Sequence, residues 1–66
     1  MYSKKEIEAL PTMSVGQEAD LKIDTGKMRV WLSRCTVADG MPYNNQVTVE
    51  KLKDGRWLTL EEYEAE

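Results

Sequence analysis

The sequence predicts an α+β fold that is mainly β: a four-stranded antiparallel meander of two β-hairpins, preceded by a short N-terminal helix. The clearest signal is Asp54-Gly55 between two alternating apolar runs within residues 46–64. Asp-Gly favours the type I′ turn that joins antiparallel strands. A second turn signal, Thr25-Gly26, lies within residues 19–36, and apolar and polar residues alternate on both sides of it. A helix-capping pattern at the start of the chain predicts the helix.

A short helix is expected over residues 4–10. Ser3 and Glu6 form a capping-box pair, in which each side chain accepts a hydrogen bond from the backbone amide of the other residue. Ile7 and Leu10 share one helical face. Pro11 ends the helix, because a proline disfavours helical geometry in the residue before it. A helix this short is unstable alone, so it is expected to dock on the sheet.

The first hairpin is expected over about residues 19–36, after an irregular stretch at 11–18. A two-residue turn at its centre would place Ile23 opposite Met28, and the next inward pair on the same face would be Leu21 opposite Val30. A loop rich in turn-forming residues, about 37–45, connects the two hairpins.

The second hairpin is expected over about residues 46–64. A turn at Asp54-Gly55 would place Val49 opposite Leu60 and Leu52 opposite Trp57. In these registers most of the apolar residues of both hairpins fall on one face of the sheet. A slip of one residue in either hairpin would move its apolar side chains to the opposite face.

The two hairpins together predict a sheet with one apolar and one mixed face, either open or rolled into a small SH3-like barrel. The apolar face would hold Leu21, Ile23, Met28, Val30, Leu32, Val47, Val49, Leu58 and Leu60. The mixed face would hold Lys22, Arg29, Trp31, Ser33, Cys35, Thr48, Glu50, Leu52, Trp57 and Tyr63.

Length and composition indicate a single small domain. The 66 residues are 41% hydrophobic and 32% charged, with a net charge of −3, which is an ordinary globular balance. Cys35 is the only cysteine, so no internal disulfide can form, and the chain has no histidine for a Cys/His zinc site. With no apolar leader and no apolar run of about 20 residues, the expected location is the cytoplasm, with no membrane association.

No catalytic activity, cofactor or metal site is predicted. Without histidine, the common Ser-His and Cys-His pairings are excluded. Cys35 is interpreted as a quiet, half-buried thiol, and the glutamates near the C-terminus as a solvated tail. The glycines are far apart and each is explained by a turn.

The leading functional hypothesis is a protein-binding module. Tryptophan and arginine are favoured anchors of protein interfaces, which makes Arg29, Trp31, Tyr43 and Trp57 the candidate contacts. A free sheet edge would also allow a homodimer. In size and acidic balance the chain is similar to the short accessory proteins of bacteria and their phages, a resemblance that covers no specific motif. As a protein-binding module it would serve as an adaptor or an inhibitor of a larger protein.

The alternative hypothesis is a single-strand nucleic-acid-binding domain. Such domains combine stacking aromatic residues with a basic surface, and Lys22, Arg29 and Trp31 are predicted on one face. The acidic net charge counts against this alternative, since nucleic-acid-binding proteins are more often basic.

Overall fold

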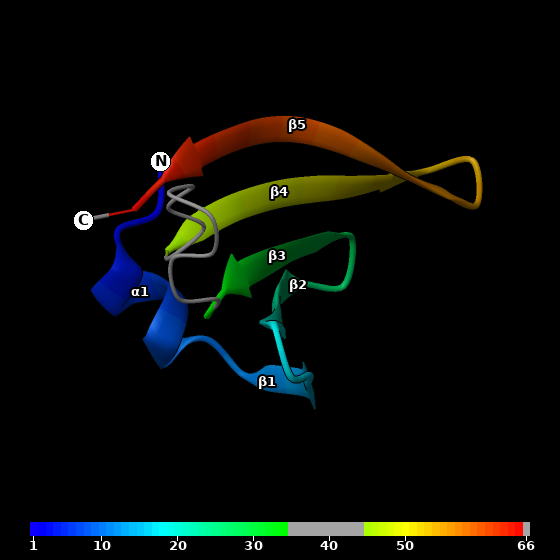
Figure 1. Cartoon of the computed structure of the whole chain (residues 1–66). Coiled ribbons are helices and arrows are strands. Elements are labelled where there is room, and N and C mark those ends of the chain that lie inside the picture. Colours follow the sequence, from blue (N-terminus) through cyan, green and yellow to red (C-terminus); the bar gives the residue numbers. More distant parts are fainter. Residues whose placement is uncertain (35–44, 66) are drawn as a thin grey trace.

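The computed structural model describes residues 1–34 and 45–65, which form an open antiparallel sheet of five strands and one short helix (Figure 1). The strands neighbour one another in sequence order, so β1 and β5 are the two edges. The mainly β meander with an N-terminal helix is confirmed, and the sheet has one strand more than predicted. The elements are α1 (Lys4–Ala9), β1 (Thr12–Val15), β2 (Ala19–Thr25), β3 (Met28–Ser33), β4 (Gln46–Lys53) and β5 (Arg56–Glu64).

The additional strand is β1, in a stretch that was predicted to be irregular. It pairs antiparallel with β2, with Val15 opposite Asp20 and a bulge between Thr12 and Ser14. All four residues of β1 are exposed, so the apolar alternation of Met13 and Val15 does not mark a buried face. Backbone pairing with β2, rather than side-chain burial, makes this segment a strand.

Helix α1 begins and docks as the sequence predicts. Ser3 Oγ accepts a hydrogen bond from the Glu6 amide at 3.1 Å, and Glu6 Oε1 accepts one from the Ser3 amide at 3.4 Å. Ile7 is fully buried, and Leu10 leaves the helix with extended backbone. The helix has six residues, and no helix in the described ranges has the length and hydropathy needed to cross a membrane.

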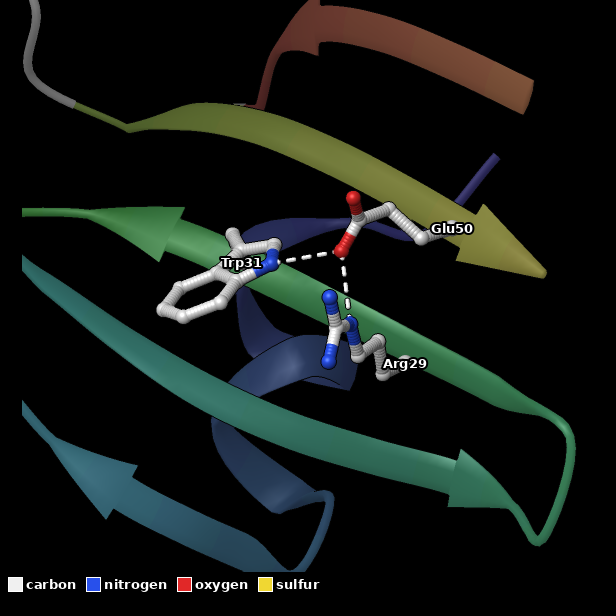
Figure 2. Close-up of polar contacts among 3 residues, drawn as sticks. All are labelled: Arg29, Trp31 and Glu50. Carbon is white, nitrogen blue, oxygen red and sulfur yellow. Dashed lines mark hydrogen bonds and ion pairs between the residues drawn. The ribbon is translucent and has the colours of Figure 1, made fainter. Parts of the chain in front are cut away.

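The core lies between α1 and one face of the sheet, which we call the helix face. The opposite side, which carries Arg29, Trp31, Glu50 and Trp57, is called the tryptophan face, and Figure 2 shows α1 behind the sheet when that face is viewed. The buried core residues are Ile7, Val30, Leu32, Val47, Val49 and Ala65, with Tyr2, Leu10, Met28 and Tyr63 packed against them.

The first hairpin pairs one residue away from the predicted register, so both predicted pairs are wrong. Ile23 lies opposite Arg29 rather than Met28, because the register shifts between β2 and β3 just after Ile23. A shift of one residue exchanges the two faces of a strand. Leu21 and Ile23 therefore lie on the tryptophan face and Lys22 lies on the helix face, which corrects the predicted face of all three.

The second hairpin keeps half of its predicted register. Leu52 lies opposite Trp57, as predicted, but a bulge between β4 and β5 places Val49 opposite Glu61 instead of Leu60. Leu60 becomes the extra residue of the bulge and is 52% exposed. The predicted inclusion of Leu60 in the core was therefore wrong.

Two further side chains differ from the prediction, Leu58 in its burial and Tyr63 in its face. Leu58 lies on the helix face but beyond the core, where it is 45% exposed. Tyr63 lies opposite Val47 on the helix face, not on the opposite face as predicted.

The predicted first hairpin extended to residue 36, whereas β3 ends at Ser33. Residues 35 and 36 and most of the predicted loop lie outside the described residues.

Tyr63 ties the N-terminus of the chain to the end of β5. Its hydroxyl accepts a hydrogen bond from the Tyr2 amide and donates one to the Tyr2 carbonyl, both at 2.7 Å. The Tyr2 hydroxyl in turn donates to the Asp24 carboxylate. This hydrogen bond, with burial, raises the pKa of Tyr2 to about 12, and burial raises the pKa of Tyr63. Both tyrosine hydroxyl groups therefore stay protonated, and uncharged, at neutral pH in the folded protein.

The β4–β5 turn supplies a stability prediction with a matched control. Asp54 and Gly55 have φ angles of 53° and 77°, the positive values that a type I′ turn requires. Gly55→Ala should lower the free energy of unfolding by about 1 kcal/mol, since an alanine at positive φ is strained. Gly26→Ala is the control, because Gly26 has no positive φ and an added methyl group meets no atom within 4 Å. Urea unfolding of both variants checks this, and equal losses would contradict it.

Candidate functional site

The tryptophan face gathers one side-chain cluster from three neighbouring strands. Strand β3 supplies Arg29 and Trp31, which are two residues apart and so project from the same face. Strand β4 supplies Glu50, directly opposite Arg29, and β5 supplies Trp57. The meander order brings these strands together, and Figure 2 shows the first three side chains on the side of the sheet away from α1.

Glu50 organises the cluster through a single carboxylate oxygen. Its Oε1 atom accepts a hydrogen bond from Arg29 Nε and another from Trp31 Nε1, each at 2.7 Å (Figure 2). The side chains of Arg29 and Glu50 are only 21% and 15% exposed, so water competes weakly for these bonds. Charge-assisted hydrogen bonds of this kind are about twice as strong as neutral ones, and they fix both side chains in place.

The Arg29 guanidinium also lies near both indole rings. Its central carbon is 4.1 Å from the centroid of the Trp57 ring and 5.6 Å from the centroid of the Trp31 ring. Both distances are within the range of cation–π attraction, which strengthens when the cation is partly desolvated. Arg29 therefore links the two tryptophans, and Glu50 balances its charge.

This arrangement presents a largely apolar surface on which the charges of Arg29 and Glu50 are paired with each other. Ile23 lies on the same face beside Arg29 and Leu52 lies beside Trp57, whereas Leu21, beside Trp31, is only 9% exposed. Among the described elements only α1 lies outside the sheet, and it packs on the helix face. No described helix or strand therefore covers the tryptophan face.

The structure brings together three of the four residues predicted as protein contacts. Arg29, Trp31 and Trp57 form the cluster, while Tyr43 lies outside the described residues. Glu50 was predicted on this face but not as a site residue. Opposite charges at facing positions of β3 and β4 were the signal that could have found it.

Lys22, which the nucleic-acid alternative grouped with Arg29 and Trp31, lies on the other side of the sheet. It pairs with Val30 across β2 and β3, is 8% exposed, and donates a hydrogen bond from Nζ to Thr12 Oγ1 at 2.5 Å. The shifted register of the first hairpin causes this change of face. The three residues of the alternative hypothesis therefore do not lie on one surface.

The described residues hold no group of three or more histidine, cysteine, aspartate or glutamate side chains placed to bind a metal ion. Comparison of the chain with models of known protein families, with curated proteins and with solved structures finds no match. The interpretation of the tryptophan face therefore depends on its own geometry and chemistry.

Proposed function

We propose that the protein is a non-enzymatic protein-binding module that docks on a larger partner protein through its tryptophan face. The observation that supports this is a pair of indole rings held by Arg29 and Glu50 on a sheet face that no described element covers. An adaptor or an inhibitor of the partner is the role that suits a domain of this size. A single cysteine suits a reducing compartment, so the proposal places the module in the cytoplasm.

The energetic reason is that the anchors are ordered before binding. Tryptophan and arginine are the residues most enriched among interface hot spots, whose loss costs 2 kcal/mol or more. Ordering a free side chain at an interface costs about 0.5–1.5 kcal/mol. Arg29 and Trp31 have already been ordered by Glu50, so association does not have to supply that cost.

The charges around this face favour a basic partner. Glu62 lies opposite Thr48, on the tryptophan face and two strands away from Arg29, and it is exposed. Glu64, two residues further along β5 and opposite Gln46, is also exposed on the tryptophan face. Such charges at the rim of an interface raise the association rate and set partner choice more than they raise affinity.

The test compares two neighbouring residues of β5 that project from opposite faces. Trp57→Ala removes an anchor of the tryptophan face, and Leu58→Ala removes an exposed side chain of the helix face. Immobilised wild-type protein and both variants are used to capture partners from an extract of the source cell, and the dissociation constant is then measured with the purified partner. Trp57→Ala should weaken binding about 30-fold or more, and Leu58→Ala less than threefold.

Urea unfolding confirms beforehand that both variants fold. The proposal is wrong if Trp57→Ala binds the partner as tightly as the wild type, or if Leu58→Ala weakens binding equally. A labelled single-stranded oligonucleotide tests the alternative in parallel, since binding driven by phosphate contacts weakens steeply with salt. The alternative has little support, because Arg29 is paired with Glu50 and Lys22 lies on the helix face.

A further inference from the structure

A polar pocket of about 240 Å³ lies on the helix face, between α1 and the ends of β2 and β3. Three cationic side chains from three separate segments line it: Lys4 of α1, Lys22 of β2, and Arg34, which follows β3. Two carboxylates, Glu8 and Asp20, also line it. The pocket lies on the opposite side of the sheet from the tryptophan face, so it is independent of the proposed protein-binding surface.

Lys22 is the least expected member of this group, because it is a charged residue with 8% of its surface exposed. Among the described residues, its ammonium has one recorded partner, the neutral hydroxyl of Thr12. An ammonium group carries three donors, and burial of a charge is costly unless the charge is paired and hydrogen-bonded. An anion in the pocket would supply the pairing that Lys22 lacks.

Asp20 shows the complementary deficit. Its Oδ1 atom is buried and accepts no hydrogen bond from residues 1–34 or 45–65. Arg34 Nε lies 3.3 Å from that oxygen, which is ion-pair distance, but the contact is not a hydrogen bond. Asp20 and Arg34 therefore balance each other in charge, while Asp20 keeps an unused acceptor beside the pocket.

The remaining charge in the pocket is positive. Once Arg34 is balanced by Asp20, Lys4 and Lys22 face a single carboxylate, that of Glu8, which is exposed. Neither lysine forms an ion pair within residues 1–34 and 45–65. This local excess of positive charge occurs in a chain whose net charge is −3.

We propose that this pocket binds the carboxylate or phosphate group of a small metabolite. Lys22 and Lys4 contact the oxyanion, and the Asp20 carboxylate, which lines the same pocket, accepts a hydrogen bond from a hydroxyl or amine on the same molecule. The pocket is smaller than the roughly 300–1,000 Å³ of sites for drug-sized ligands, which favours a ligand of a few carbon atoms. A partly desolvated site also strengthens each charge-assisted hydrogen bond.

The test is a titration of the ¹⁵N-labelled protein, followed by amide chemical shifts at constant ionic strength. The probes are inorganic phosphate, propionate and lactate, and the last two differ by one hydroxyl group. We expect saturable shifts at Leu32 and Asn45, which line the pocket. Saturation by phosphate alone or by the carboxylates alone supports the proposal and identifies the oxyanion. Tighter binding of lactate than of propionate identifies Asp20 as an acceptor.

Lys22→Met keeps the apolar stem and removes the charge, and it should weaken binding about tenfold or more. Lys27→Met is the matched control, because Lys27 is exposed in the turn between β2 and β3, and it should leave binding unchanged. Lys4→Gln provides a second reading on α1 and should weaken binding several-fold. If Lys22→Met does not fold, the proposal is tested by comparing the probe affinity of Lys4→Gln with that of Lys27→Met.

Two results would overturn the proposal. One is a set of weak, non-saturating shifts distributed over the exposed lysines with all three probes. The other is equal binding by the wild type and Lys22→Met, or by the wild type and Lys4→Gln if Lys22→Met does not fold. In either case Lys22 serves only to pack its methylene stem over the core.

Discussion

Ile7→Ala should lower the free energy of unfolding by about 2–5 kcal/mol, the usual cost of truncating a fully buried isoleucine. Ile7 is 0% exposed and is the only buried residue of α1. Its side chain packs with Val30 and Val47 in the core. Native domains have only about 5–15 kcal/mol of stability, and one of 66 residues is near the lower end of that range. This variant should therefore be partly unfolded at 25 °C.

Glu8→Ala is the matched control, because Glu8 is the next residue of α1 and is exposed. Its free energy of unfolding should change by less than about 0.5 kcal/mol. Urea unfolding followed by tryptophan fluorescence and by circular dichroism measures both variants. If Ile7→Ala is as stable as Glu8→Ala, then α1 is not docked on the sheet in solution.

Glu50→Ala is expected to have the second largest effect, a loss of about 2–4 kcal/mol. The substitution leaves Arg29 Nε and Trp31 Nε1 without the acceptor that both use. Hydrogen bonds to charged groups contribute about 1.5–3 kcal/mol, and a partly buried donor left without a partner adds its desolvation cost. Glu50→Gln should lose less, because a carbonyl oxygen remains at the same position.

A double-mutant cycle isolates the interaction between Glu50 and Arg29. With side chains 15% and 21% exposed, the coupling free energy should exceed the roughly 0.2–1 kcal/mol of exposed ion pairs. Glu62→Ala is the control, since Glu62 is an exposed carboxylate on the same face and should change stability little. A coupling of zero would mean that Glu50 does not organise the tryptophan face.

The same variants connect stability to the proposed function. At a temperature where it remains folded, Glu50→Gln should bind the partner protein more weakly than the wild type, although the Glu50 side chain is only 15% exposed. The physical reason is that Arg29 and Trp31 would then be less ordered before association. Binding as tight as that of the wild type would show that the ordering of these side chains is not needed for recognition.

Signals confined to a few neighbouring residues were read correctly from the sequence. The Ser3 and Glu6 pair caps α1 as predicted, because a capping box is completed within four residues. Asp54-Gly55 forms the predicted turn and sets Leu52 opposite Trp57, because the required positive φ values are a property of those two residues. Arg29, Trp31 and Trp57 were also predicted correctly to share a face.

Errors of prediction arose wherever a bulge changed the register. The shift between β2 and β3 moves Lys22 to the helix face, and the bulge opposite Val49 removes Leu60 from the core. A bulge adds one residue to one strand of a pair, and whether it forms depends on how the two strands fit together. No pattern within a single strand reports that fit.

The amino-acid sequence by itself thus determined the capped helix, the β4–β5 turn and the strands that carry the two indole rings, since each depends on local conformational preferences. Only the tertiary structure decided which face each residue of β2 occupies, that Glu50 joins Arg29 to Trp31, and that Lys22 lines a polar pocket under α1. These features depend on how whole strands pair with one another, where one inserted residue exchanges the buried and the exposed face.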